Sequence, residues 1–245
     1  MGFIFLIFLS WTGFSSGKTA KDFIGLTKPI YQKTTKMGKS RNANRRDIVQ
    51  NCYVYKNFAI VEVIDPGNKG AVDMRLRPRN PKHKPAGICV KDYKGKSIQL
   101  EQMGGYFAGV AESLIFVDDS DAFGGEMAFQ VIDSKNGREL FRSIRNINEK
   151  VLIRAGKTIG IRYTKALQVD CSLLEEGKNC WKYILNANKI PDNNRIPMPD
   201  CAPAYEASGV TKDVRPQLAA WVRVKNLKKP EVTYLGGFIK CEPSP

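Results

Sequence analysis

The sequence predicts a mainly β protein, an antiparallel sandwich or an open barrel with one short helix, braced by disulfides. Three observations support this prediction. Short runs of β-branched and aromatic residues recur along the 245 residues, with Gly, Pro and Asn turn signals between them. No long helical patterns alternate with these runs, which argues against a parallel α/β sheet. Six cysteines follow an apolar leader, and hydrophobic residues make up 42% of the chain, which is enough for a core.

The chain begins with an apolar leader that is typical of a secretory signal. Residues 2–14 carry no charge, and a helix of this length is too short to cross a bilayer core of about 30 Å. Ser15 and Gly17 provide the small residues of a cleavage site, so we expect residues 1–17 to be a signal peptide. No Lys or Arg precedes Lys18, so the usual basic start is missing; a start farther upstream and an uncleaved anchor are the alternatives. We therefore expect a secreted or periplasmic protein whose mature chain has no transmembrane span.

Residues 18–50 are polar and strongly basic, and we expect them to form a flexible arm. Residues 31–47 contain almost no apolar side chains, so the segment cannot bury enough surface to offset the entropy of ordering. The arm is interpreted either as an electrostatic tether for an anionic partner or as a solvated linker. Residues 51–245 are then predicted to form a single β-rich domain. The basic residues of the arm are Lys33, Lys36, Lys39, Arg41, Arg45 and Arg46.

The domain is predicted to consist of strands that are joined by turns and loops. Prolines mark residues 77–85 and 191–203 as loops, because proline fixes φ and removes a donor from the sheet. Asn136–Gly137 fits the positive φ of a tight turn, which predicts a hairpin around it. We expect strands within residues 56–64, 71–77, 86–92, 97–102, 106–119, 127–132, 140–144, 150–171, 218–227 and 232–241.

One segment has helical spacing. Residues 179–190 form the pattern of a short amphipathic helix, and Asn179 is its expected N-cap. Trp181, Ile184 and Leu185 recur on one side of this helix and would form its buried face.

The six cysteines are expected to form disulfides, because an even number behind an export signal fits an oxidising compartment. Six cysteines allow fifteen pairings, among which the sequence cannot choose. A Gly-containing turn favours a local pair between Cys171 and Cys180, which would stabilise the fold by roughly 2–3 kcal/mol. Zinc is not expected, since the chain has no C-x-x-C spacing and only one histidine. The cysteines are Cys52, Cys89, Cys171, Cys180, Cys201 and Cys241.

An acidic segment, Val117–Phe129, contains three aspartates and a glutamate around a Gly-Gly pair. It does not fit an EF-hand loop, because Phe123 and Gln130 occupy two of the ligand positions. The favoured interpretation is a solvent-facing turn between strands. One alternative is a carboxylate-dependent hydrolase of envelope glycan that uses Glu126 with Asp119. The other alternative is a looser calcium site made of Asp118, Asp119, Asp121 and Glu126.

No nucleophilic system is indicated by the remaining motifs. His83 is the only histidine, and we expect it to be exposed in its Pro-punctuated basic loop. Four Gly-Lys-Ser/Thr triplets lack the earlier glycine that a P-loop requires. The sequence therefore predicts a non-enzymatic protein with no catalytic residues and no cofactor.

The strongest global feature is a formal net charge of +15, which is densest over residues 33–46 and 75–84. Such a field attracts an anionic partner and is weakened by salt. Behind an export signal, we expect an anionic envelope component or an acidic protein rather than nucleic acid. Alternatively, the charge serves only solubility, or the chain is a secreted inhibitor or immunity protein whose stapled loop 171–180 plugs a partner's site. The residues expected to contact an anionic partner are Arg75, Arg77, Arg79, Lys82 and Lys84.

Tyr106–Leu140 contains a Phe-Ala-Gly strand, a Gly-Gly turn and the hairpin sequence "VIDSKNGREL". In this order of features the segment resembles a family of uncharacterised secreted bacterial proteins. The sequence departs from that family by having Asp and Ser near the turn, where Cys and Gly are expected. The resemblance implies an exported, β-rich protein, and it assigns no activity and no functional residue.

Overall fold

The structure is a computed structural model, and it describes residues 22–243 except 102–103, 123–125, 157, 168, 191–195, 210–213 and 225–230. The expected signal peptide, residues 1–17, lies outside the described residues. Among the described residues, strands are far more extensive than helices, which confirms the mainly β prediction. Within the described ranges, no helix has both the length and the apolar character that crossing a membrane requires.

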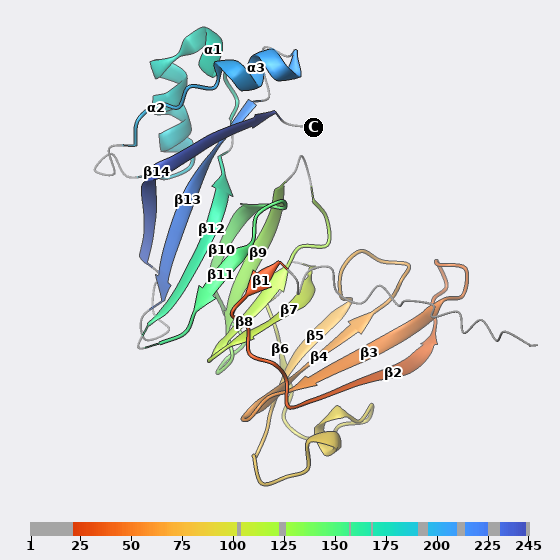
Figure 1. Cartoon of the computed structure of the whole chain (residues 1–245). Coiled ribbons are helices and arrows are strands. Elements are labelled where there is room, and N and C mark those ends of the chain that lie inside the picture. The colour runs from red at the N-terminus through yellow and green to blue at the C-terminus, as the bar shows by residue number, and fades with distance from the viewer. Residues whose placement is uncertain are drawn as a thin grey trace, which may run out of the picture.

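The strands form three sheets, which we call A, B and C (Figure 1). Neighbouring strands are antiparallel throughout, apart from a short parallel pair at one edge of sheet A. Sheet A has the order β1 (Phe23–Ile24), β11 (Val151–Arg154), β12 (Ile159–Ala166), β13 (Val214–Val224) and β14 (Glu231–Pro243). Sheet B has the order β10 (Glu139–Asn146), β9 (Glu126–Asp133), β8 (Leu114–Asp118) and β7 (Tyr106–Ala111). Sheet C has the order β2 (Tyr31–Lys39), β3 (Asp47–Val54), β4 (Phe58–Ile64), β5 (Asp73–Pro78) and β6 (Ile98–Gln99).

Sheet B is the middle layer of a three-layer sandwich. Leu114 and Phe116 of β8 belong to the core between sheets A and B, whereas Ile115 and Val117 belong to the core between sheets B and C. Successive residues of a strand point to opposite faces, so both faces of β8 are buried. This explains why the sequence of β8 has consecutive apolar residues instead of alternating apolar and polar ones.

The prediction of one long strand over residues 106–119 was wrong. β7 and β8 are two strands of a hairpin, and the turn lies at Glu112 and Ser113. Glu112 adopts a φ of 52°, which is a left-handed conformation that is uncommon for residues other than glycine. The turn contains no Gly, Pro or Asn, so it could not be recognised from the strongest turn signals.

The expected hairpin around Asn136–Gly137 is confirmed as β9 and β10. Gly137 takes the positive φ of the turn, at 76°, and its amide donates to the Asp133 carbonyl over 2.8 Å.

The expectation of a flexible arm over residues 18–50 was wrong for its described part, residues 22–50. This part forms β1, β2 and the first half of β3. β2 is an edge strand that is held by backbone pairing with β3, which requires no apolar side chains. Lysines commonly prevent such an edge from pairing with another chain. The lysine-rich composition of β2 is therefore the same as that of a solvated linker, which is why the prediction failed.

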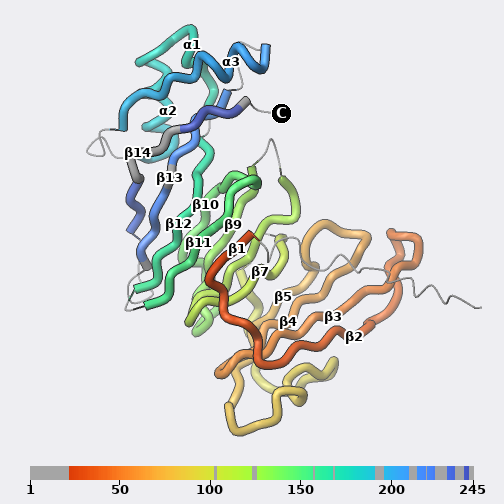
Figure 2. The backbone as a smooth tube through the Cα atoms, in the orientation of Figure 1, coloured from red at the N-terminus to blue at the C-terminus, as the bar shows by residue number. Residues whose placement is uncertain are grey.

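The segment 22–31 connects all three sheets (Figure 2). Phe23 pairs with β11 in sheet A, and its ring packs 5.9 Å from that of Phe116 in sheet B. The Thr27 amide then donates to the Val110 carbonyl of sheet B, and the Ile30 amide donates to the Val54 carbonyl of sheet C. We call this segment the strap.

Three α-helices, α1 (Leu173–Glu176), α2 (Lys178–Ala187) and α3 (Ala202–Ser208), pack at one end of sheet A (Figure 1). The expected helix is confirmed as α2, with Trp181 and Ile184 buried and Leu185 partly buried. Its N-cap is Gly177 instead of Asn179. Two further helices were not predicted: α1 is only one turn long, and the first turn of α3 contains a proline, which also suits a helix start.

Three disulfides, Cys52–Cys89, Cys171–Cys180 and Cys201–Cys241, join all six cysteines. The favoured local pair is therefore confirmed. Cys201–Cys241 ties the start of α3 to β14, and Cys52–Cys89 ties the 3₁₀ helix η2 (Pro85–Cys89) to β3.

Candidate anion-binding face

Positive charge is concentrated in the part of the chain that forms the strap and sheet C. Residues 22–100 contain 17 Lys and Arg against 6 Asp and Glu, a net charge of +11. Residues 101–245 contain 20 Lys and Arg against 18 Asp and Glu, a net charge of +2. Residues 101–245, which include sheet B, the helices and most of sheet A, thus have almost no net charge, and most of the positive charge of the protein belongs to residues 22–100.

Strand pairing brings Lys33 of the first basic segment and Arg75 of the second onto one face of sheet C. Lys33, Cys52, Val61 and Arg75 are direct neighbours across β2, β3, β4 and β5, so their side chains share a face. Lys33 and Arg75 are three strand spacings apart, about 14 Å. The opposite face of sheet C packs on sheet B, so the shared face is the outer one.

The disulfide from Cys52 to Cys89 holds the loop of residues 79–97 against this outer face, where it forms the yellow loop beneath sheet C in Figure 1. The loop adds five exposed lysines to the exposed Lys33 and Arg75 of the strands. We call the resulting surface the basic face, and it consists of Lys33, Arg75, Lys82, Lys84, Lys91, Lys94 and Lys96.

Two of the five residues expected to contact a partner have another role. Arg77 is buried, and its Nη1 donates to the carbonyls of Ile88 (2.7 Å) and Val90 (3.1 Å). Its guanidinium lies 4.7 Å from the centre of the Tyr93 ring, and burial lowers its pKa. Arg77 therefore fixes the loop on the sheet instead of facing solvent.

Arg79 likewise uses its guanidinium within the protein. Nη1 donates to the Lys56 carbonyl over 2.8 Å, and Nη2 donates to the carbonyls of His83 (2.6 Å) and Pro81 (3.2 Å). His83 is exposed, as expected. Of the five expected residues, Arg75, Lys82 and Lys84 are exposed on the basic face, and Arg75 also contacts Asp73 over 2.8 Å.

The acidic segment does not form the alternative calcium site. Asp118 pairs with Arg145, Asp121 with Lys69 over 2.6 Å, and Glu126 with Arg215 over 2.8 Å. Asp119 instead accepts backbone amide hydrogen bonds, from residues 120 and 121 of its own turn. Among the described residues, no group of three or more His, Cys, Asp or Glu is placed to hold a metal ion. Each of the four carboxylates thus has partners of its own, which are cations for three of them, and one member of the set is buried.

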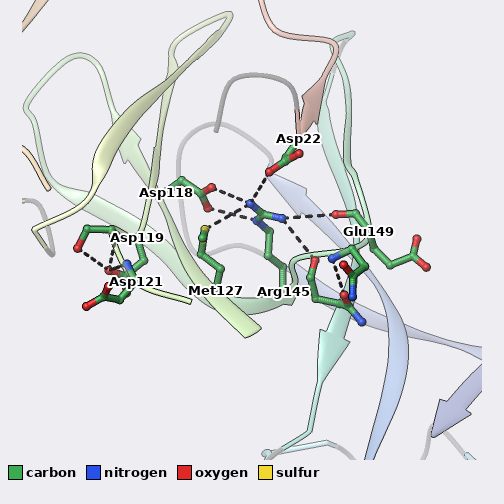
Figure 3. Close-up of polar contacts among 10 residues, drawn as sticks. Asp22, Asp118, Asp119, Asp121, Met127, Arg145 and Glu149 are labelled. Carbon is green, nitrogen blue, oxygen red and sulfur yellow. Dashed lines mark hydrogen bonds and ion pairs between the residues drawn. The ribbon is translucent and has the colours of Figure 1, made fainter. Parts of the chain in front are cut away.

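That buried member, Asp118, forms a charged centre with Arg145 (Figure 3). The Arg145 side chain is 1% exposed, and its Nη2 and Nε lie 2.7 and 3.2 Å from the two Asp118 oxygens. Nη2 also lies 3.2 Å from Asp22, and the guanidinium stands 5.4 Å from the ring centre of Phe23. Nη1 donates to the backbone carbonyl of Glu149. This centre anchors the strap to sheet B, and no sequence motif indicated it.

Asp118 gives the stability of the protein a defined pH dependence. Burial raises its pKa to about 6, although Arg145 opposes the shift. The folded protein then binds a proton more tightly than the unfolded chain, so stability contributed by this group is present below about pH 4 and lost as the pH rises through 6. Compared with Asp118→Asn, the wild-type free energy of unfolding should fall by about 1–3 kcal/mol between pH 4 and 7.

Urea unfolding of both proteins at several pH values measures this difference. Burial also raises the pKa of Glu62, but both proteins contain Glu62, so its contribution cancels. A wild-type stability that rises with pH relative to the variant would contradict the assignment.

The two carboxylates of the hydrolase alternative, Asp119 and Glu126, line one cavity of about 480 Å³. Asp121, Asp170 and Arg215 complete its charged lining. Arg215 pairs with Glu126, so the cavity contains an ion pair instead of two free carboxylates. Hydrolysis at this cavity stays a prediction. The inhibitor alternative also stays a prediction; its loop, which the Cys171–Cys180 disulfide closes, contains α1.

No known protein family, curated protein or solved structure matches the chain. The resemblance over Tyr106–Leu140 therefore stays a prediction.

Proposed function

We propose that this chain is an exported, non-enzymatic protein that binds an anionic envelope polymer through the basic face. The observation that carries the proposal is the convergence of charge: residues 22–100 have a net charge of +11, and strand register and a disulfide bring seven of their 17 cationic side chains onto one outer face. Three disulfides are consistent with an oxidising compartment and therefore with export.

The construction of the face suits a long, repetitive anion. The lysines are spread over the outer side of a sheet and over one loop, so they can interact with many charges of an extended polymer at once. Arg77, Arg79 and the Cys52–Cys89 disulfide hold the loop in place, which lowers the entropy lost on binding. Exposed lysines keep their hydration and flexibility, so binding should be electrostatic and tolerant of the exact spacing of the anions.

Charge reversal on the basic face tests this proposal. The triple variant Lys82→Glu, Lys84→Glu, Lys94→Glu should bind polyphosphate and heparin at least about tenfold more weakly than wild type, since each reversed charge removes an attraction and adds a repulsion. Titration calorimetry at low salt measures both affinities.

A matched control separates the face from net charge. Lys150→Glu, Lys178→Glu, Lys182→Glu changes the total charge equally at exposed positions outside residues 22–100. The control should retain most of the affinity. Equal losses in the two triple variants would show that net charge acts without a defined face. Tighter binding of poly-glutamate than of either polyanion would point to an acidic protein instead.

A further inference from the structure

The outer face of sheet A carries a second concentration of cations, around a tryptophan. Register places Arg162 and Trp221 directly opposite each other on β12 and β13, and in the next row Arg154, Gly160 and Arg223 are neighbours across β11, β12 and β13. The residues between them in sequence, such as Ile161 and Val222, belong to the core against sheet B. Trp221 and the three arginines therefore share the face that points away from sheet B.

Trp221 lies along this face. A side-chain carbon at Gly160 would lie only 2.4 Å from Cζ2 of Trp221 and 2.8 Å from Cη2. The glycine thus leaves the space in which the indole ring rests against the sheet. Trp221 is half-buried, unlike Trp181, which is buried with its Nε1 donating to the Ile196 carbonyl. The indole of Trp221 therefore presents an apolar surface beside the arginines of this face.

The three arginines around this ring are exposed. Arg223 stands opposite Glu231 in the register, yet among the described residues none of Arg154, Arg162 and Arg223 forms an ion pair. Guanidinium groups bind carboxylate and sulfate in bidentate geometry. The strand spacing separates Arg154 from Arg223 by about 10 Å, so more than one anionic group can be bound at once.

We propose that this arginine–tryptophan face binds an acidic polysaccharide. A sugar ring would stack its apolar C–H face on Trp221, and carboxylate or sulfate groups on the same or the next sugar would bind Arg162 and Arg223. Single-stranded nucleic acid fits less well, because successive bases require several aromatic rings, and Trp221 is the only aromatic residue in these two rows of the described sheet. An acidic peptide would bind the arginines through its carboxylates and would not require an indole ring.

The proposal is independent of the basic face, because sheets A and C are the two outer layers of the sandwich and their outer faces point away from each other. The two faces also differ in chemistry. The basic face has mainly lysines, which act as point charges, whereas this face combines guanidinium groups with a stacking ring.

Calorimetric titration of the full chain with three acidic oligosaccharides, oligogalacturonate, hyaluronan and heparin fragments, tests this proposal. At least one should bind, and Trp221→Ala and Arg162→Gln/Arg223→Gln should each weaken that binding at least about tenfold. Gly160→Ala should weaken it as well, because the added carbon displaces the indole while all three arginines remain. Near-ultraviolet circular dichroism and thermal unfolding verify that each variant is folded.

Two controls identify the site and the ligand. The variant Lys82→Glu, Lys84→Glu, Lys94→Glu should retain the part of the binding that depends on Trp221. This variant therefore distinguishes saccharide binding at the arginine–tryptophan face from polyanion binding at the basic face. An uncharged oligosaccharide of equal length should bind far more weakly. The proposal is overturned if no acidic oligosaccharide binds, if Trp221→Ala retains wild-type affinity, or if oligothymidylate binds through Trp221 more tightly than any saccharide.

Discussion

Replacing Arg145 with Met should lower the free energy of unfolding by about 3–5 kcal/mol at pH 7. Asp118 is fully buried, and Arg145 is the cation that neutralises it. Without Arg145, the Asp118 carboxylate is left buried and uncompensated. The same substitution removes the contacts of the guanidinium with Asp22 and Phe23, so the start of the strap should be held less firmly to sheet B.

Two comparisons separate this mechanism from a general loss of packing. Adding Asp118→Asn to Arg145→Met should recover much of the stability, because the uncompensated charge is then gone. Arg142→Met is the matched control: it lies on the same strand, is half exposed and pairs with Glu139, and should cost less than about 1 kcal/mol. Urea unfolding measures all four proteins. If Arg145→Met costs no more than Arg142→Met, the charged centre does not stabilise the fold.

Replacing Cys52 and Cys89 with serine should cost about 4 kcal/mol in the chain-entropy account, because this disulfide closes a loop of 37 residues. Replacing Cys171 and Cys180, which are 9 residues apart, should cost about 2.5 kcal/mol. The first variant should also bind polyanions more weakly, since the loop that carries five of the lysines loses its covalent attachment to sheet C.

The functional part of this prediction has its own control. The variant without Cys171–Cys180 should bind polyanions like wild type, because that disulfide lies among the helices at the end of sheet A. Calorimetric titration of both variants at a temperature where each is folded tests this difference. Unchanged affinity in the Cys52/Cys89 variant would mean that Arg77 and Arg79 are sufficient to position the loop.

The sequence predicted the features that depend on local composition. The β content, the hairpin at Gly137, helix α2 and the local disulfide all follow from turn residues, apolar spacing or proximity. The strand β2 could not be predicted in this way. Its stability comes from backbone pairing with β3, and its lysine-rich composition is the same as that of a disordered linker.

Only part of the candidate site could be predicted, because composition shows the charge of a segment but not which of its side chains are exposed. Net charge and the basic run at residues 75–84 indicated an anionic partner, and Lys82 and Lys84 are exposed as expected. The sequence could not show that Arg77 is buried under the loop, because exposure depends on the Cys52–Cys89 pairing and on the position of Tyr93. Nor could it show that Lys33 shares a face with Arg75, because that depends on the register of four strands.

The central claim, electrostatic binding through the outer face of sheet C, is tested most directly by the salt dependence of polyphosphate affinity. Between 50 and 200 mM salt, the wild-type dissociation constant should rise at least about tenfold, as expected when several cations release the counterions of a linear polyanion. The slope should be smaller in Lys82→Glu, Lys84→Glu, Lys94→Glu and unchanged in the Lys150, Lys178 and Lys182 control. An affinity that is constant over this range of salt would contradict the account.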